Sequence, residues 1–198
     1  MYRCLIANRG EIAVRIIRAC RELGIETVAI YAKGDESSLH VSLADQAVCV
    51  GEANALDSYL NQDRIISAAE MTGANAIHPG YGFLSESPSF AHKVEENDIY
   101  FIGPTKETMQ MMGDKITARQ TVDQAGVPII PGSTDAVESV DEVKEIAKEI
   151  GYPLVLKAAS GGGGKGIRIV KEPEMLDKSF KEAKSEGKKY FDDDRIYV

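Results

Sequence analysis

The segment YPLVLKAASGGGGKGIRIV, residues 152–170, places four consecutive glycines, and a fifth one residue later, between two apolar, β-rich stretches. Glycine loses more backbone freedom on ordering than any other residue, so the run predicts a point where the bare backbone must approach something closely. The order of strand, glycine loop and strand predicts a β-hairpin. Lys157 interrupts the apolar residues of the first strand, and strand alternation puts it on the same face as Val155 and Ala159.

Two common nucleotide motifs do not fit this loop. Gly161, Gly163 and Gly166 satisfy the spacing G-x-G-x-x-G, which would favour an NAD-dependent oxidoreductase. That fingerprint requires a helix to begin at its last glycine, whereas residues 167–170 are strand formers. A P-loop requires Lys followed by Ser or Thr after the last glycine, and Ile167 stands there instead.

A hairpin flap over a phosphate chain is the hypothesis that remains. Backbone N–H groups of glycines can approach phosphate oxygens closely, and Lys165 at the predicted tip adds a positive charge. The alternatives are a flexible linker for the loop and a solvated edge residue for Lys157. Linkers mix glycine with serine over longer stretches and do not lie between two β-rich strands. The loop and Lys157, together on one hairpin, therefore favour anion binding.

The first hundred residues alternate short apolar runs with helical patterns. In the helix predicted after residue 10, for example, Ile12, Ile16 and Cys20 share one apolar face. Strands that alternate with such helices predict βαβ units and a parallel, doubly wound sheet, and hence an α/β fold. The predicted strands are residues 4–7, 26–32, 45–50, 76–78 and 99–103, and the later helices are residues 61–71 and 87–97.

The pattern changes near residue 113, where a domain boundary is predicted. The elements predicted beyond it are helices at 114–125 and 140–150, a short proline-bracketed strand at 127–132, and a Lys/Glu-rich helix opened by Pro173. The predicted domains are therefore 1–113 and 114–198. The second stops inside the apolar run RIYV, so an incomplete domain is expected there.

Composition and charge narrow the class of protein. Hydrophobic residues make up 43% and charged residues 27% of the 198 residues, as in ordinary globular proteins. The formal net charge of −8 argues against a nucleic-acid binder, because a phosphate backbone attracts the opposite sign. The three cysteines lack metal-type spacing and are interpreted as reduced thiols of a cytoplasmic protein. No secretion signal fits the charged N-terminal residues, and no membrane-spanning run is present.

The histidines show no spacing that predicts a metal site. His40 and His92 are predicted at the surface. His78, in HPGYGFLSE, is predicted to serve the structure or to line an interdomain cleft rather than to carry out chemistry. Arg9 and Glu11 follow the first predicted strand, where doubly wound sheets place ligands, and an ion pair or a subunit contact is expected for them.

Longer stretches carry a family resemblance over essentially the whole chain. YPLVLKAASGGGGKG resembles the carbamoyl-phosphate-synthetase-type signature of the ATP-grasp superfamily. IANRGEIAVRIIRACRELGI, AIHPGYGFLSE, and FIGP followed by MGDK are similar to biotin carboxylases, in the order that the family has. The resemblance implies a Rossmann-like, pre-ATP-grasp N-terminal domain with a doubly wound parallel sheet, followed by the first part of an ATP-grasp domain that bears the glycine-rich flap.

The resemblance also implies an activity. Biotin carboxylases use ATP and bicarbonate to carboxylate biotin on a carrier protein, through carboxyphosphate and with Mg²⁺ on the phosphates. The subunit most similar to this chain serves acetyl-CoA carboxylase in fatty acid synthesis. The implied partners are a biotin carboxyl carrier protein, a carboxyltransferase and a second copy in a homodimer. The alternatives are part of pyruvate carboxylase or of another biotin-dependent carboxylase, or a stand-alone nucleotide-binding module.

The same resemblance assigns residues to the nucleotide. Lys115, from MGDK, and Lys157 are expected to contact it. The flap residues expected to cover the phosphates are Gly161, Gly162, Gly163, Gly164, Lys165 and Gly166. The family often has arginine at the position of Lys165. Lysine there keeps the positive charge but cannot make the bidentate contact of an arginine. The family's catalytic and metal-binding groups follow beyond residue 198, so the chain as given is expected to be inactive and to bind MgATP weakly.

Overall fold

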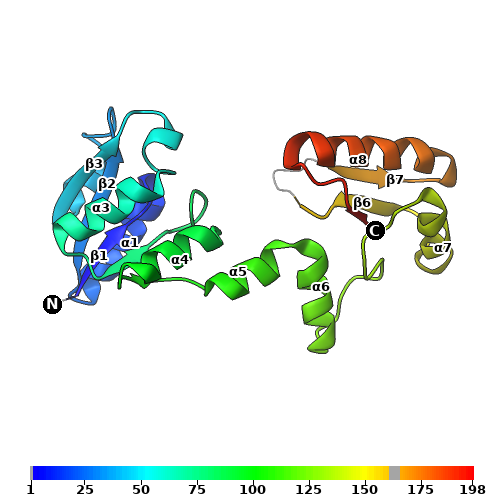
Figure 1. Cartoon of the computed structure of the whole chain (residues 1–198), viewed down its shortest axis with the longest axis horizontal. Coiled ribbons are helices and arrows are strands. Elements are labelled where there is room, and N and C mark those ends of the chain that lie inside the picture. The colour runs from blue at the N-terminus through cyan, green and yellow to red at the C-terminus, as the bar shows by residue number, and fades with distance from the viewer. Residues whose placement is uncertain (1, 161–165) are drawn as a thin grey trace. The chain divides into compact units, whose positions relative to one another are not determined.

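The computed structural model describes residues 2–160 and 166–198. The chain divides into two compact units, Met1–Met109 and Gln110–Val198 (Figure 1). Helix α5 (Lys106–Gly113) spans this division. The domain boundary predicted near residue 113 stays a prediction, and each unit is described below by itself.

The first unit contains a five-stranded parallel sheet in the order β3-β2-β1-β4-β5 (Figure 1). Its strands are β1 (Arg3–Ile6), β2 (Glu26–Ala32), β3 (Gln46–Gly51), β4 (Ala76–His78) and β5 (Tyr100–Phe101). The chain runs outward from β1 to β3 and then crosses back to β4 on the other side of β1. This order is that of a doubly wound sheet, so the predicted fold class is confirmed.

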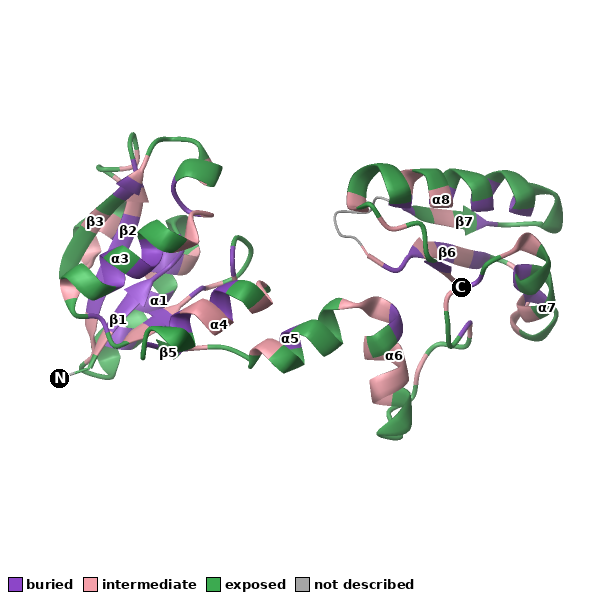
Figure 2. Ribbon diagram, viewed as in Figure 1, coloured by how far each residue is buried: buried purple, intermediate pink, exposed green. Residues whose placement is uncertain are grey.

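Both faces of the sheet are covered at its centre, which explains why β1 and β2 are largely apolar. Leu5 packs with Ile77 and Phe90 on one face, whereas Ile6 packs with Ile17 on the other. All five of these side chains are almost completely buried. Figure 2 shows much of β1 and β2 in the colour of buried residues. Burial of each contributes roughly 2 kcal/mol, so the two cores fix the position of every strand end.

Local sequence signals set the ends of the helices in this unit. Asn61 caps α3 by accepting the N–H of Arg64, and Gly73 ends it with a left-handed φ of 65°. Ser87 caps α4 by accepting the N–H of Phe90. The helices are α1 (Gly10–Glu22), α2 (Leu39–Leu43), α3 (Gln62–Thr72) and α4 (Pro88–Glu96), with a 3-10 turn η1 at Ala55–Asp57.

The second unit is built on a three-stranded antiparallel sheet in the order β7-β6-β8. Leu154 and Leu156 of β6 pack under α8 with Leu176 and Phe180, and α7 adds Val143 to this core. One face of the sheet is thus covered and the other is left open. The elements are α6 (Lys115–Gln124), α7 (Val140–Ile150), β6 (Leu154–Ala158), β7 (Ile167–Val170), η2 (Pro173–Met175), α8 (Leu176–Phe191) and β8 (Ile196–Tyr197).

The strand predicted at 127–132 does not form. Pro128 and Pro131 lack the N–H group that a strand ladder needs. Ile130 is 83% exposed, so the apolar run has no sheet to pack against. Proline spacing, rather than hydrophobicity, decides the conformation of this segment.

His40 is buried, which corrects the surface position predicted for it. Its side chain is 1% exposed, and its Nε2 lies 3.2 Å from the carbonyl oxygen of Ile30. Its Nδ1 has no hydrogen-bond partner among residues 2–160 and 166–198. Burial lowers the pKa of His40 below its ordinary value. In the same described ranges, no helix is long and apolar enough to cross a membrane.

Candidate nucleotide-binding site

Lys157 lies in the middle of the open face of the β7-β6-β8 sheet. The strand register sets it directly opposite Ile167 on β7 and Tyr197 on β8. Its neighbours Leu156 and Ala158 point into the core, whereas Lys157 and Val155 are half-buried on the other side. Within the described residues, Lys157 has no carboxylate partner. A lone cation on an apolar sheet face favours binding of an anion that carries an apolar group.

The open face forms one wall of a cavity of about 540 Å³. Lys157, Val155 and Tyr197 line it from the sheet, and Arg119 lines it from α6. The Arg119 guanidinium donates to the carbonyl oxygen of Ile130, and its buried Nε has no partner in the described part of the chain. Glu149 also lines the cavity, so two cations face one carboxylate there.

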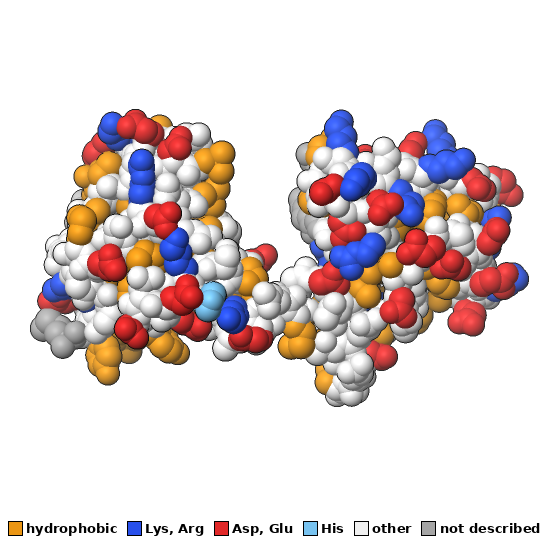
Figure 3. Space-filling view, in the orientation of Figure 1, with side chains coloured by type: hydrophobic (Ala, Val, Ile, Leu, Met, Phe, Trp, Pro, Cys, Tyr) orange, Lys and Arg blue, Asp and Glu red, His pale blue; other side chains and the backbone are white. Residues whose placement is uncertain are grey.

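Several other cations of this unit differ from Lys157 because each has a carboxylate partner. On the visible surface, Lys and Arg side chains lie interspersed with Asp and Glu (Figure 3). Arg168 contacts Glu182 at 3.1 Å and Glu186 at 2.5 Å, and Lys184 lies 3.4 Å from Asp194. Such pairs satisfy each other, whereas no carboxylate among the described residues pairs with Lys157.

Gly166 is required by its conformation and by its surroundings. Its φ is +69°, and a Cβ atom there would lie 2.8 Å from the Cβ of Ala158. Its N–H donates to Glu186 Oε2 at 3.0 Å, and its carbonyl accepts the N–H of Ala158 at 2.9 Å. The structure thus uses Gly166 to close the hairpin next to Lys157. Its predicted contact with a nucleotide stays a prediction.

Lys115 is the first residue of α6, and it is half-buried. Asp114 caps this helix, because its Oδ1 accepts the N–H groups of Ile116 at 3.1 Å and Thr117 at 2.9 Å. A cation at a helix N-terminus, where N–H groups are concentrated, suits a phosphate. The predictions for Gly161, Gly162, Gly163, Gly164 and Lys165 lie outside the described residues.

The loops after β1 and β4 lie at the point where the strand order of the first unit reverses. The buried Asn8 side chain donates to the carbonyls of Pro79 at 2.8 Å and Tyr81 at 2.7 Å. Gly80 has a φ of +67°, and its N–H donates to His78 Nδ1 at 3.0 Å. Burial lowers the pKa of His78. These contacts favour a structural role for His78, which stays a prediction.

Arg9 forms an ion pair, as expected for the residues after β1. Its guanidinium contacts Asp35 at 2.7 Å and lies 5.6 Å from the ring centre of Tyr59. The Tyr59 hydroxyl donates to the second oxygen of Asp35 at 2.6 Å. Glu11 instead accepts a hydrogen bond from the Tyr81 hydroxyl. Arg9, Asp35 and Tyr59 thus contact one another, and Glu11 pairs separately with Tyr81, which favours a structural role for both sets.

Magnesium has no fitting site among the described residues. Residues 2–160 and 166–198 contain no group of three or more His, Cys, Asp and Glu side chains arranged to hold a metal ion. Carboxylate oxygens are what Mg²⁺ requires from a protein. We therefore derive no step through the ion from this chain.

The comparisons with known families agree with this geometry. Residues 114–198 match the family described as carbamoyl-phosphate synthase L chain, ATP binding domain. That match makes the second unit part of an ATP-grasp nucleotide-binding domain. Residues 1–109 match the biotin carboxylase N-terminal domain. The chain belongs to the biotin carboxylase family.

Individual relatives support the same assignment over nearly all of the chain. Biotin carboxylase 1 of Bacillus subtilis (strain 168) is 52% identical over 99% of this chain and 44% of its own length. A biotin carboxylase–β,γ-ATP complex from Campylobacter jejuni has a TM-score of 0.92 at 46% identity, covering 98% of this chain and 44% of that one.

A third relative is the biotin carboxylase domain dimer of Hydrogenobacter thermophilus 2-oxoglutarate carboxylase, solved with MgADP, ADP and bicarbonate. It has a TM-score of 0.88 at 50% identity and covers 98% of this chain and 43% of that one. The chain thus spans less than half the length of the relatives that it matches.

Three residues around Lys157 were not identified from the sequence. Alternation within IRIV and RIYV places Ile167 and Tyr197 on a strand face, but only the sheet order sets both beside Lys157. No local pattern singles out Arg119, because its importance comes from a cavity that two distant segments build.

Proposed function

We propose that this chain forms the N-terminal part of a biotin carboxylase and provides one side of its ATP site. The observation that carries the proposal is Lys157, a cation that has no carboxylate partner among the described residues and lies between Ile167 and Tyr197 on the open face of an ATP-grasp sheet. An apolar face with one central cation suits a nucleotide, because the base needs apolar contact and the phosphates need positive charge.

In the reaction proposed for the whole protein, a bicarbonate oxygen attacks the γ-phosphorus of ATP and the bond to ADP breaks. The resulting carboxyphosphate delivers its carboxyl group to a ureido nitrogen of carrier-bound biotin, with release of phosphate and a proton. Lys157 and Lys115 hold the phosphate chain through charge, and the glycine run adds backbone N–H groups. Fixed cations and N–H groups of this kind stabilise charge on a transferring phosphoryl group.

The test is a titration of the 198-residue chain with MgADP, followed by backbone amide NMR. Because the relatives are more than twice as long, we expect a weak Kd of about 1 mM. The shifts should be largest at Val155, Ile167 and Tyr197. Lys157→Ala should weaken binding roughly tenfold.

Lys171→Ala is the matched control, since Lys171 is an exposed lysine just after β7. It removes the same charge from the same hairpin but not from the open face. Equal affinity in Lys157→Ala and Lys171→Ala would contradict the proposed site. Shifts confined to the first unit would contradict it as well.

We also propose that the 198 residues alone do not carboxylate biotin, because their relatives are more than twice as long. The assay is ADP release that depends on both biotin and bicarbonate. Release by the chain as given would overturn this part of the proposal. Such a result would not bear on the proposed nucleotide site, because that site is tested by the MgADP titration.

For the final carboxyl acceptor we propose acetyl-CoA, in fatty acid synthesis, with a biotin carboxyl carrier protein and a carboxyltransferase as partners. The free thiols of Cys4, Cys20 and Cys49 suit the reducing cytoplasm, where this chemistry would take place. The 2-oxoglutarate carboxylase relative favours a keto acid as the alternative acceptor. Assays of the native complex with acetyl-CoA, pyruvate and 2-oxoglutarate distinguish these acceptors.

A homodimer is part of the same proposal, because one relative is described as a domain dimer. Sedimentation of the native protein tests it, and a monomer at micromolar concentration would contradict it. The alternative of a nucleotide-binding module without catalysis would be supported by a native protein that binds MgADP tightly and releases no product.

A further inference from the structure

A carboxylate holds Ser160, the residue just before the glycine run. Ser160 donates its hydroxyl to Asp193 Oδ2 at 2.6 Å, across 33 residues of sequence. Asp193 lies just beyond α8, in the segment that leads into β8, and its side chain is only 16% exposed. This contact holds the chain just beyond the end of β6, three residues after Lys157.

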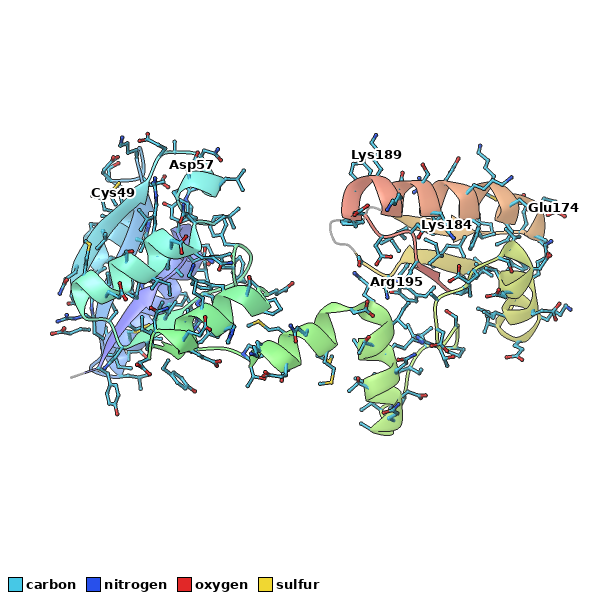
Figure 4. The ribbon with its side chains drawn as sticks, viewed as in Figure 1. Cys49, Asp57, Glu174, Lys184, Lys189 and Arg195 are labelled. Carbon is cyan, nitrogen blue, oxygen red and sulfur yellow. The ribbon has the colours of Figure 1, made fainter. Side chains whose placement is uncertain are left out.

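Arg195 extends this contact to a second element. Its guanidinium binds both oxygens of Asp193, with Nε at 3.0 Å from Oδ1 and the terminal nitrogen at 2.7 Å from Oδ2. The same terminal nitrogen lies 2.9 Å from Oδ2 of Asp114. Figure 4 marks Arg195 on the segment between α8 and β8. The backbone takes part too, since Ala159 donates its N–H to the carbonyl of Arg195 at 2.9 Å.

Asp114 connects this network to Lys115. One oxygen of Asp114 caps α6 and the other receives Arg195, so both are engaged. Lys115 is the next residue and the first of the helix. Hydrogen-bonded side chains therefore run without a break from Ser160 through Asp193 and Arg195 to Asp114.

We propose that Asp193 and Arg195 are positioning residues, which lock the end of the Lys157 strand to the start of the Lys115 helix so that both lysines meet one phosphate chain. This inference rests on the proposed function, because it names what aligns the two halves of that site. Neither residue needs to touch the nucleotide. Their effect is on the geometry of groups that do, for which small displacements matter greatly.

The chemistry of the network distinguishes it from an ordinary surface ion pair. A planar guanidinium that binds one carboxylate through two nitrogens and a second carboxylate through one of them has little freedom to rearrange. The hydrogen bonds from Arg195 hold the pKa of Asp193 well below its usual range, so the carboxylate stays charged at any working pH. By contrast, the neighbouring pair Lys188–Asp192 joins two exposed side chains on one helix end.

The experiment compares MgADP affinity in four variants of the 198-residue chain. Arg195→Gln and Asp193→Asn each break the network, and we expect each to raise the Kd roughly fivefold to tenfold. Arg195→Lys keeps the charge and one contact, and it should recover part of this loss. Lys188→Gln is the control, since it removes a cation from the same region outside the network.

The Asp193→Asn variant distinguishes a positioning role from a purely electrostatic effect on anion binding. Removal of a negative charge would tighten anion binding if only electrostatics mattered, whereas loss of alignment weakens it. Urea unfolding of each variant shows that it is folded before its affinity is compared. Tighter binding in Asp193→Asn, or equal affinity in Arg195→Gln and Lys188→Gln, would overturn the positioning role.

The same titration distinguishes failure of this inference from failure of the proposed function. If Lys157→Ala weakens binding and Arg195→Gln does not, the nucleotide site stands and the positioning role is wrong. If the parent chain shows no MgADP binding at millimolar concentration, the proposed site is wrong and the positioning role is overturned with it.

Discussion

Gly166 donates its N–H to the carboxylate of Glu186 at 3.0 Å, and the two residues are separated by 20 positions in the sequence. The same carboxylate accepts from Arg168 at 2.5 Å. One acid on α8 therefore holds both Gly166, the last glycine of the run, and the strand that follows it.

Replacing Glu186 with alanine should lower the free energy of unfolding by about 2 kcal/mol. The carboxylate accepts charge-assisted hydrogen bonds from partly buried groups, and its loss leaves a backbone N–H without its partner. Urea denaturation measures the change. Glu182→Ala is the control, because Glu182 also contacts Arg168, at 3.1 Å, and otherwise lies 4.0 Å from the exposed Lys178. Loss of these exposed contacts should cost under about 1 kcal/mol. Equal losses in the two variants would show that the Gly166 contact contributes nothing.

Gly166→Ala should destabilise the chain by roughly 3 kcal/mol. Part of this comes from the left-handed φ of +69°, and the rest from a Cβ placed 2.8 Å from that of Ala158. Gly126→Ala isolates the two contributions, since Gly126 has a φ of +74° and open space around it. That control should cost only about 1 kcal/mol. A control that loses as much as Gly166→Ala would rule out the steric contribution.

Stability should fall as the pH drops below about 6.5, the ordinary pKa of histidine. Burial lowers the pKa of His40 and of His78 in the folded chain, so the unfolded chain takes up protons first. The folded state therefore loses stability from that pH down towards the folded pKa values. Urea midpoints at pH 7.5 and 5.5 measure the effect, and His40→Gln should reduce the slope. A midpoint that rises on acidification through this range would contradict the assignment.

Thiol reactivity should distinguish one cysteine from the other two. Cys49 is exposed on β3 (Figure 4), whereas Cys4 and Cys20 are buried. Burial raises the pKa of Cys4 to about 12 and that of Cys20 in the same direction, and a thiol that stays protonated is a poor nucleophile. A disulfide reagent should therefore modify one thiol quickly in the native chain and all three in urea. The fast phase should vanish in Cys49→Ser, and its persistence there would place a second thiol at the surface.

Sequence patterns were most reliable where local chemistry and burial agree. The helices predicted at 61–71 and 87–97 form, because their starts are set by local contacts: Asn61 and Ser87 each cap a first turn. The run ETVAIYA predicted a strand because both of its faces meet apolar cores. The strand predicted at 127–132 was wrong because hydrophobicity was given more weight than the missing N–H groups of two prolines. The surface position predicted for His40 was wrong because α2 packs against the carboxyl end of β2, a contact that no local pattern predicts.

In the candidate site, too, some residues could be identified from the sequence and others could not. Lys157 could be identified from the sequence because a lysine in an apolar strand beside a glycine run is unusual in itself. Arg119, Tyr197, Asp193 and Arg195 could not be identified, because their partners lie on other elements. Nothing in the local sequence distinguishes Arg195 from an ordinary surface arginine. Its contact with Asp114 depends on where β8 pairs in the sheet.

The sequence by itself determined the alternation of strands and helices, the doubly wound class of the first unit and the family to which the chain belongs. These follow from periodicity, capping and long motifs, which are properties of neighbouring residues. Only the tertiary structure decided which side chains meet. Lys157 gains its place between Ile167 and Tyr197 from the order of three strands, and Ser160 is joined to Asp114 through residues more than 30 positions away. Contacts of such separation depend on how the elements pack, because packing brings distant groups within hydrogen-bonding range.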